Sequence, residues 1–238
     1  IAKQLIPHRL IKKHEDKLRG LVALSYKGNN VTCTVCDKSF SKFIKLENGD
    51  LLCPNCGSLP RTRRLIELIE VENNLEIKKV LHFSPPKGFR EKLRKLELGS
   101  YITTDYEGEF DADKRLNIEA IEETDNQYDI IICYHVLEHI IKDEQAIGEL
   151  YRVLKQEGVC FIQTPFKDGD IYEDYSITSR TGRLEHFGQE DHVRVYSVEG
   201  LKKRLEQKGF VVEVLNFNEP EENKKGFARE VVLKAIKK

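Results

Sequence analysis

The stretch Tyr128–His135, with the sequence YDIIICYH, constrains the fold more than any other part of the chain. After Asp129 its apolar residues are nearly continuous, which is typical of a strand that is buried on both faces. Such strands belong to parallel sheets that carry helices on both sides, because two parallel strands need a long crossover connection. This stretch therefore predicts the centre of an α/β sheet.

Strand and helix patterns alternate on either side of that stretch. Further strands are predicted over 77–83, 101–106, 115–118, 158–165, 211–217 and 228–236, and helices over 87–98, 143–155 and 197–210. The last two strands are joined by a short polar link, so we expect them to pair antiparallel. The pattern predicts an α/β fold with a doubly wound, mostly parallel seven-stranded sheet and an antiparallel last strand.

Four cysteines precede this sheet. Cys33, Cys36, Cys53 and Cys56 have the spacing C-x2-C-x16-C-x2-C. This spacing is typical of two knuckles that hold one tetrahedral Zn²⁺ through four thiolates. Because the protein would fill every coordination position, we expect a structural zinc and not a catalytic one. The residues between the two pairs predict a short hairpin that turns at Asn48-Gly49.

The chain is expected to form two domains with opposite charge. Residues 1–64 would hold an amphipathic helix over 4–21 and a zinc-ribbon-like module, and residues 65–238 would hold the sheet. The first part has 13 Lys and Arg against 5 Asp and Glu, a formal charge of +8, and the remainder has 26 against 35, a formal charge of −9. A basic domain can attract RNA or a phosphorylated substrate, or it can simply be solvated.

Three arginines begin the helix after Pro60, at the end of a helix where cations are unfavourable. We expect Arg61, Arg63 and Arg64 to contact an anionic group, and a carboxylate of the larger domain would suffice. No stretch is apolar and long enough to span a bilayer, and the chain does not open on a secretory signal pattern. The expectation is a cytoplasmic protein without membrane insertion.

Several motifs resemble class I S-adenosylmethionine-dependent methyltransferases, of the methyltransferase type 11-like group. They are YDIIICYHVLEHI, ELYRVLKQEGVCFIQTP and the strand-terminal Asp105, within about residues 76–236. The segments CPNCGSLPR and FGQEDHVRVYS are similar to those of bacterial members that carry an N-terminal zinc module. Such members are often found with surface-polysaccharide genes, which implies a sugar-type acceptor.

The resemblance implies where S-adenosylmethionine binds. The loop HFSPPKG after the first strand contains one glycine where related loops have two or three, and Pro85 and Pro86 are expected to fix its turn. Asp105 would accept hydrogen bonds from the ribose, and Asn117 stands where the family usually has an aspartate. The implied cofactor-binding residues are His82, Phe83, Ser84, Pro85, Asp105, Tyr106, Asn117, Ile118, Cys133, Tyr134 and His135.

A hydroxyl acceptor loses a proton when it is methylated, so it needs a general base. His139 and His192 are the candidates, because histidine can be neutral at about pH 7. Asp191 adjoins His192, although two neighbouring side chains need not meet. His139 can alternatively be a structural residue that packs the turn after its strand.

The segment between Pro165 and Ser197 is predicted to be a long loop without clear secondary structure. Loops of this length in compact domains are often functional lids. Arg183, His186 and Arg194 in this loop could hold an anionic group of a sugar-linked or phosphorylated acceptor.

The expected function is S-adenosylmethionine-dependent methyl transfer to a small molecule, namely the hydroxyl or amine of a sugar or related metabolite. An RNA base methyltransferase with a zinc module for RNA binding is the alternative enzyme, which the basic N-terminal part favours. A non-catalytic binding protein on a degenerate methyltransferase fold is the third hypothesis, which the glycine-poor loop favours.

Overall fold

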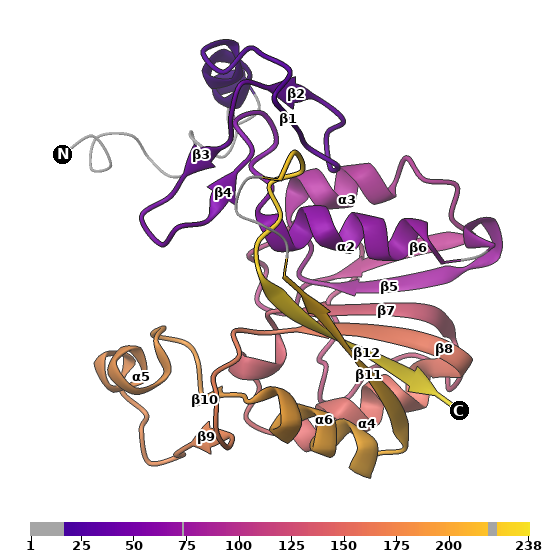
Figure 1. Ribbon diagram of the computed structural model, residues 1–238. Coiled ribbons are helices and arrows are strands. Elements are labelled where there is room, and N and C mark those ends of the chain that lie inside the picture. The colour runs from indigo at the N-terminus through magenta and orange to yellow at the C-terminus, as the bar shows by residue number, and fades with distance from the viewer. Residues whose placement is uncertain (1–16, 73, 219–222) are drawn as a thin grey trace. The chain divides into compact units, whose positions relative to one another are not determined.

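The computed structural model describes residues 17–72, 74–218 and 223–238 (Figure 1). The chain divides into two compact units. The first comprises residues 1–73, 86–95 and 217–230, and the second comprises residues 74–85, 96–216 and 231–238. The division predicted at residue 64 stays a prediction.

The first unit contains two small antiparallel pairs. Strand β1 (Val31–Thr32) pairs with β2 (Ser39–Phe40), and β3 (Ile44–Lys45) pairs with β4 (Leu51–Leu52). The β3–β4 turn includes Gly49 at φ +90°, so the predicted hairpin is confirmed. Residues 17–24 are helical, whereas residues 4–16 of the predicted helix lie outside the described residues.

Two longer helices complete the first unit. Helix α2 spans Pro60–Glu70 and α3 spans Lys87–Leu93. Pro60 occupies the first helical position, where its missing N–H costs no hydrogen bond. The apolar side chains of α2 are buried at Leu65, Ile66 and Ile69, which have the spacing of one helix face.

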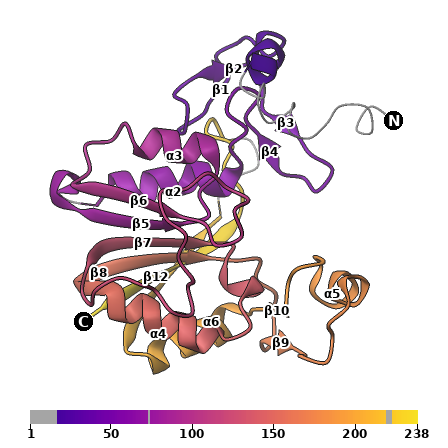
Figure 2. The ribbon, with the colours of Figure 1, turned by 180° about the vertical axis from the view of Figure 1, so that it is seen from behind.

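The second unit contains a six-stranded sheet in the order β11-β12-β8-β7-β5-β6 (Figures 1 and 2). The strand bounds are β5 Lys79–Phe83, β6 Ser100–Thr104, β7 Tyr128–Tyr134, β8 Leu154–Gln163, β11 Phe210–Phe217 and β12 Glu230–Lys237. β5 pairs parallel with both β6 and β7, and β7 pairs parallel with β8. The last strand, β12, pairs antiparallel with β8. The predicted α/β class with an antiparallel last strand is confirmed.

The predicted strand count was wrong by one. The stretch expected as a strand over 115–118 follows a single parallel bridge between Thr104 and Lys114, and Asn117 then bridges Ala120 across a tight turn. The hydroxyl of Thr104 accepts a hydrogen bond from the backbone N–H of Leu116 at 2.9 Å. Side-chain and turn contacts thus satisfy the backbone where we expected a seventh strand.

The second prediction to be corrected is the unstructured loop before Ser197. Strand β9 (Tyr172–Glu173) pairs antiparallel with β10 (Arg194–Val195), and helix α5 (Arg180–Phe187) lies between them in the chain. Ser179 caps α5 by accepting a hydrogen bond from the N–H of Gly182 at 3.1 Å. Short elements of this kind carry too little periodicity to be recognised from a sequence.

The main core lies on one face of the sheet. Helices α4 (Asp143–Val153) and α6 (Val198–Gln207) lie side by side against that face (Figures 1 and 2). Alternate strand residues such as Leu81, Ile131 and Ile162 point into this core. A short 3-10 turn, η2 (Leu75–Ile77), precedes β5, and a second, η3 (Leu137–His139), comes after β7. Among the described residues, no helix is both long enough and apolar enough to cross a membrane.

Candidate active site and metal centre

The order of the strands places a topological switch point between β5 and β7. The chain runs from β5 to β6 on one side and then returns to β7 on the other side of β5. In open α/β sheets, ligands bind where the connections diverge in this way, at the carboxyl ends of the strands. The residues that come after β5, β6, β7 and β8 are therefore the first place to look for a site.

Two residues other than glycine adopt left-handed backbone conformations at the carboxyl ends of the strands. Ser84 directly after β5 has φ +49°, and His135 directly after β7 has φ +53°. Such conformations are costly for residues other than glycine and tend to cluster at functional sites. The loop after β5 therefore turns as a glycine loop does, but with a serine at the turning position.

The single glycine of that loop has a different role. Gly88 lies in the first turn of α3, where an added Cβ would come within 3.1 Å of the carbonyl oxygen of Cys56. It therefore allows α3 and the second cysteine pair of the first unit to approach closely. The sequence alone did not indicate this role.

Asp105 follows β6 and is held by two hydrogen bonds. Ser84 Oγ donates to Oδ1 at 2.9 Å, and the backbone N–H of Phe110 donates to Oδ2 at 3.2 Å. Asp105 is only 6 % exposed, whereas the neighbouring Tyr106 is 49 % exposed and carries the Arg115 guanidinium over its ring. An ionised carboxylate has about four acceptor positions, so Asp105 retains room for further donors.

The other predicted cofactor residues differ in their surroundings. His82 lies inside β5, where Nδ1 is 2.9 Å from Tyr101 Oη and burial lowers the pKa of the ring to about 3. Phe83, Ile118 and Cys133 belong to the core, and Pro85 and Tyr134 are buried. The Asn117 side-chain oxygen accepts a hydrogen bond from the N–H of Glu119 at 2.9 Å. Their contacts with a cofactor stay predictions.

Glu138, His139 and His192 form a cluster after β7. Their potential ligand atoms all lie within 4.8 Å of one another. The rings of His139 and His192 meet edge to face with centroids 4.7 Å apart. Asp191 contacts His139 and not the adjacent residue His192. Its Oδ2 lies 3.3 Å from Nδ1 of His139. All three predicted catalytic residues are thus together, although their catalytic role stays a prediction.

The charges in this cluster are set by burial and by neighbours. Burial raises the pKa of Glu138, but the contact of Oε1 with His135 Nδ1 at 3.2 Å more than offsets this, so the pKa lies below its ordinary value. Burial and the nearby His139 lower the pKa of His192. Both shifts favour an ionised Glu138 beside a neutral His192.

Several buried polar atoms at this edge have no hydrogen-bond partner among the described residues. They come from the turn after β7, from the end of β8 and from the segment before β10. They are His135 Nε2, both carboxylate oxygens of Glu138, Gln163 Oε1, Thr164 Oγ1 and His192 Nε2. Buried polar atoms are almost always paired, so this group fits a site that binds a polar ligand.

Arg194 holds the turn that carries Glu138 and His139. It is 0 % exposed, and its guanidinium donates to the carbonyl oxygens of Leu137, Ile140 and Ile141. It also donates to Glu173 Oε2 at 2.9 Å. Arg194 is therefore a positioning residue, and its donors are not available for an anionic acceptor as the sequence suggested.

The contributions of Glu138, Gln163 and Thr164 were not predicted from the sequence, and Arg194 was predicted to hold an anionic group and not to position a turn. Gln163 ends the strand β8 and Thr164 follows it, and this position is a general signal for residues near a ligand in an α/β sheet. Arg194 gave no such signal, because its partners come from turns more than 50 positions earlier in the chain. Of the other two anion candidates, His186 Nδ1 lies 2.8 Å from Tyr172 Oη, and Arg183 donates to the carbonyl of Ile177 at 3.4 Å.

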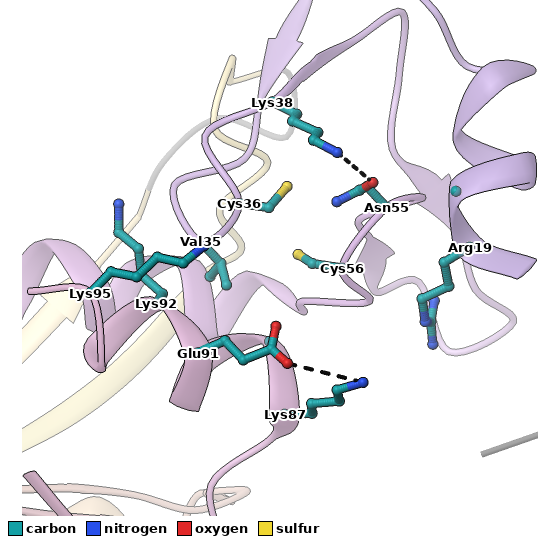
Figure 3. Close-up of a pocket in the computed structure, with 12 residues that line it drawn as sticks. Arg19, Val35, Cys36, Lys38, Asn55, Cys56, Lys87, Glu91, Lys92 and Lys95 are labelled. Carbon is teal, nitrogen blue, oxygen red and sulfur yellow. Dashed lines mark hydrogen bonds and ion pairs between the residues drawn. The ribbon is translucent and has the colours of Figure 1, made fainter. Parts of the chain in front are cut away.

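The first unit contains a cavity of about 500 Å³ beside its cysteines (Figure 3). Cys36 and Cys56 are among the residues that line it. One carboxylate, Glu91, lies 4.0 Å from Lys87, and Lys38 donates to Asn55 at 3.0 Å. The cations that line the cavity are Arg19, Lys38, Lys87, Lys92 and Lys95.

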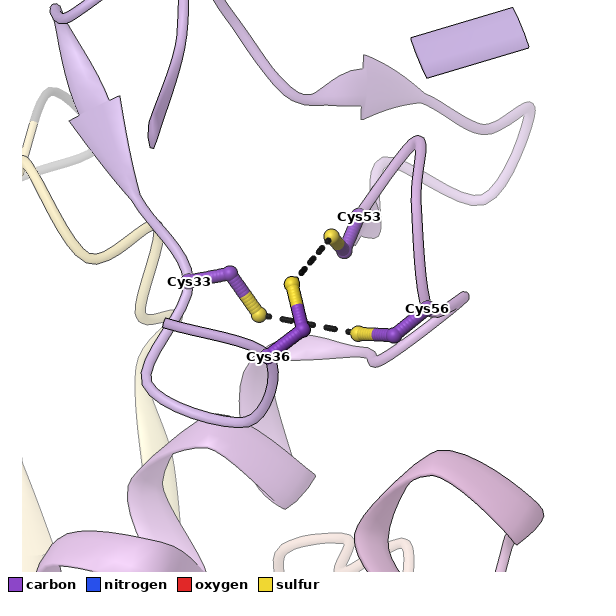
Figure 4. A group of neighbouring side chains, drawn as sticks. All are labelled: Cys33, Cys36, Cys53 and Cys56. Atoms are coloured by element: carbon purple, nitrogen blue, oxygen red, sulfur yellow. Dashed lines mark hydrogen bonds between the residues drawn. The ribbon is translucent and has the colours of Figure 1, made fainter. Parts of the chain in front are cut away.

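The four predicted metal ligands converge on one point (Figure 4). Sγ of Cys33 lies 3.7 Å from Sγ of Cys56, and Sγ of Cys36 lies 3.7 Å from Sγ of Cys53. With zinc–sulfur bonds of about 2.3 Å, the edge of a tetrahedron of sulfurs is about 3.8 Å, so the cluster fits a four-thiolate zinc site. All four cysteines are free thiols, and the separations exclude disulfides.

The two cysteine pairs have the same local backbone. The N–H of Asp37 donates to the carbonyl of Cys33 at 2.8 Å, and the N–H of Gly57 donates to that of Cys53 at 3.0 Å. Asp37 and Gly57 both have positive φ, +56° and +71°. Each pair is therefore a knuckle that turns its thiols toward one centre.

The arginines of α2 are mostly occupied within the first unit. Arg63 is fully buried and donates to the carbonyl oxygens of Ser58, Leu51 and Lys225, so it ties the second knuckle to β4. Arg64 pairs with Glu230 at 3.3 Å, and Arg61 lies 3.8 Å from Asp50. Arg61 and Arg64 thus meet carboxylates of the chain itself, as the sequence led us to expect, whereas Arg63 donates to neutral carbonyl oxygens.

Comparison with known proteins agrees with the fold. Residues 51–215 match the methyltransferase domain family. The YcgJ protein from Bacillus subtilis is 14 % identical with a TM-score of 0.52, covering 72 % of this chain and 96 % of that one. A SAM-dependent methyltransferase from Archaeoglobus fulgidus is 20 % identical with a TM-score of 0.53, covering 74 % and 93 %. The comparison with curated proteins found no match.

The similar structures also include a protein with another reaction. The [4+2]-cyclase SpnF is 14 % identical with a TM-score of 0.51, covering 73 % of this chain and 80 % of that one. At such identities the likeness is one of fold, and a fold alone does not identify a reaction. The family match, in contrast, covers more than half of the chain. The chain belongs to the methyltransferase domain family.

Proposed function

We propose that this protein is an S-adenosylmethionine-dependent methyltransferase that acts on a small molecule. The cofactor would lie along the carboxyl ends of β5, β6 and β7. When bound, it supplies a methyl group on a sulfonium, and the electron pair of the broken carbon–sulfur bond stays on sulfur. The task of the protein is then to align an acceptor with that methyl group and to exclude water.

The observation that carries this proposal is the environment of Asp105. Its carboxylate is 6 % exposed, lies at the end of β6 beside the switch point, and is steadied by Ser84 and by the N–H of Phe110. Two vicinal ribose hydroxyls are suitable donors for its remaining acceptor positions. Tyr106, which is half exposed beside it, offers an aromatic face for the adenine.

The acceptor would bind near the ends of β7 and β8. Gln163 Oε1, Thr164 Oγ1 and His135 Nε2 are buried and free to bond hydroxyl or amine groups. A sugar or related metabolite offers several such groups, in agreement with the resemblance to enzymes found with surface-polysaccharide genes. For a hydroxyl acceptor, His192 or His139 would take the proton, and Asp191 would stabilise the resulting charge on His139.

We propose that the four cysteines hold a structural Zn²⁺ in a domain that comprises residues 1–64, ahead of a catalytic domain over 65–238. The sulfur separations of 3.7 Å match a tetrahedral site with all positions filled by protein. Ser58 Oγ lies 3.1 Å from Cys33 Sγ and 3.3 Å from Cys56 Sγ, where a hydroxyl can donate to a thiolate. The zinc would contribute to folding and not to methyl transfer.

The basic cavity of the first unit favours a second candidate, an RNA base methyltransferase. Four thiolates on Zn²⁺ carry a formal charge of about −2. Five cations line the cavity beside the single lining carboxylate of Glu91, and Lys92 among them also pairs with Asp37 at 2.9 Å and with Glu70 at 3.7 Å. RNA or another phosphorylated molecule is the kind of partner that such a surface attracts.

Transfer of a labelled methyl group distinguishes these candidates. The purified protein would be incubated with methyl-tritiated S-adenosylmethionine and either a pool of nucleotide sugars and related metabolites or unmodified ribosomal RNA. The proposal predicts label in the small-molecule fraction, and its loss in Asp105→Asn. Label in RNA, with binding that weakens steeply as salt rises, would support the second candidate. Label in neither, together with failure to bind the cofactor, would favour the non-catalytic binding protein.

A further inference from the structure

We propose that Glu138, His139 and His192 bind a second, divalent metal ion, separate from the four-cysteine site. Binding of the ion itself is independent of the proposed function. Its role, which is to hold an oxygen acceptor next to the cofactor, rests on the proposed function.

The three side chains have the composition of a transition-metal site. Two imidazoles and one carboxylate with open positions suit Zn²⁺, Mn²⁺, Fe²⁺ or Co²⁺, whereas Ca²⁺ and Mg²⁺ prefer oxygen ligands alone. The ligand atoms lie within 4.8 Å of one another. Ligands with bonds of about 2.1 Å lie about 3 Å apart when they are adjacent on one ion, so small side-chain rotations suffice to close the site.

The burial of Glu138 is the second, independent observation. Its side chain is 1 % exposed, yet no hydrogen bond of good geometry from any described residue reaches either carboxylate oxygen. The ring of His135 approaches it, with Nδ1 at 3.2 Å from Oε1. A buried charged group is costly unless it is paired or coordinates a metal. A divalent cation, bound by one or both carboxylate oxygens, would neutralise the buried charge of Glu138.

The two histidines are oriented as metal ligands commonly are. His192 is 4 % exposed, and its Nε2 has no hydrogen-bond partner among the described residues, so Nε2 can bind an ion. Nδ1 of His139 faces Asp191 at 3.3 Å, which leaves Nε2 for an ion. A metal-binding histidine usually donates its other ring N–H to a carbonyl or a carboxylate in this way.

The backbone around the ligands is held from several directions. The N–H of Val193 donates to the carbonyl of Glu138 at 2.9 Å, which fixes the His192 segment to the turn that carries the other two ligands. Arg194 then donates to the carbonyls on both sides of that turn, at Leu137 and at Ile141. The ligands are thus preorganised although they come from distant parts of the chain.

The place of the ion predicts its role. η3 comes shortly after β7, whose last residues are the predicted methionine end of the cofactor site. A divalent ion polarises a hydroxyl that it contacts and makes it easier to deprotonate. The hydroxyl proton can then leave to water, the oxygen forms the new bond to the methyl carbon, and the carbon–sulfur electron pair stays on sulfur. With the ion bound, His139 and His192 act as ligands, and polarisation by the ion replaces the general base named above for the metal-free enzyme; the acceptor atom is oxygen.

The test counts metals on the full-length protein. Protein loaded with Zn²⁺ is titrated with CoCl₂, passed through gel filtration, and analysed for zinc and cobalt per chain. The proposal predicts two metal equivalents in the unaltered protein and one in both Glu138→Gln and His192→Ala. Glu144→Gln, at an exposed carboxylate of α4, is the matched control and retains two. Circular dichroism and thermal unfolding establish that each variant is folded.

The cobalt spectrum identifies the site. Cobalt at Glu138, His139 and His192 gives visible bands without the thiolate charge-transfer band that cobalt in the four-cysteine site would show. One equivalent in the unaltered protein, or two in folded Glu138→Gln, would overturn the proposal. Cofactor titration in the same samples separates the two hypotheses: a second metal without cofactor binding sinks the proposed function alone, and cofactor binding with a single metal sinks this inference alone.

Discussion

Ser84 Oγ lies 2.9 Å from Asp105 Oδ1, so the residue that turns the chain after β5 also holds the carboxylate that ends β6. This contact gives a loop with a serine in place of a glycine a way to fit the proposed cofactor site. The left-handed backbone of Ser84, at φ +49°, is strained for a residue with a side chain, and its hydroxyl provides a contact that glycine lacks.

Substitution of Ser84 separates these two effects. Ser84→Ala loses the hydrogen bond and keeps the strained backbone, so we expect the free energy of unfolding to fall by about 1 kcal/mol. Ser84→Gly loses the same hydrogen bond but relieves about 1 kcal/mol of backbone strain, so its stability should be close to that of the unaltered protein. Urea unfolding measures both. Ser84→Gly less stable than Ser84→Ala would contradict this account.

Arg194 should be among the residues most important for stability in the second unit. Arg194→Lys keeps the charge but cannot reach Glu173 and three carbonyls together, so we expect a loss of about 3 kcal/mol in the free energy of unfolding. Arg183→Lys, at a half-buried arginine of the same segment, is the matched control and should change little. Equal effects in the two variants would show that the carbonyl contacts of Arg194 are unimportant.

His82 should make stability depend on pH. Burial lowers the pKa of His82 in the folded protein to about 3 from its ordinary 6.5. As pH falls below about 6.5, the unfolded chain takes up the proton first, so stability that is complete above that pH is lost by up to about 1.4 kcal/mol per pH unit. Urea unfolding between about pH 6.5 and pH 5 should show a shallower slope in His82→Gln. His186→Gln, at an exposed histidine, should keep the original slope.

The four-cysteine site should be required for the order of its surroundings. Cys53→Ser is expected to lose one zinc equivalent and the hydrogen-exchange protection of residues 31–58, because structural zinc sites contribute directly to folding. Cys160→Ala is the control: Cys160 is a buried thiol of β8, outside the cluster, so zinc should be retained. Elemental analysis and amide exchange measure the two effects. Full protection of residues 31–58 in zinc-free protein would contradict the prediction.

The sheet and the zinc ligands could be predicted because their signals are local. The apolar run at 128–135 and the two cysteine pairs each lie within a few residues, and the alternation of strands and helices predicts the sheet around them. The strand predicted over 115–118 does not form. The N–H of Leu116 donates to the side-chain Oγ1 of Thr104 and not to a backbone carbonyl of a neighbouring strand. The apolar residues of this stretch are buried in the core and looked like those of a strand.

The candidate site was predictable only in part, because most of its contacts join residues that are distant in the sequence. His139 and His192 were recognisable as candidates from their residue type, but their partners were not. Asp191 adjoins His192 in the sequence and contacts His139 in the structure. Contacts of this kind depend on how β9, α5 and β10 bring distant residues together, and no local pattern records them.

The central claim is that Asp105 holds the ribose of S-adenosylmethionine. It is tested most directly by isothermal titration of the cofactor into the unaltered protein, Asp105→Asn and Asp125→Asn. Asp125 precedes β7, at the opposite edge of the sheet, and pairs with Arg152. The account predicts binding by the unaltered protein and by Asp125→Asn, and at least a tenfold weaker affinity for Asp105→Asn, or about 1.4 kcal/mol. Equal binding by all three, or no binding by the folded and zinc-loaded protein, would contradict it.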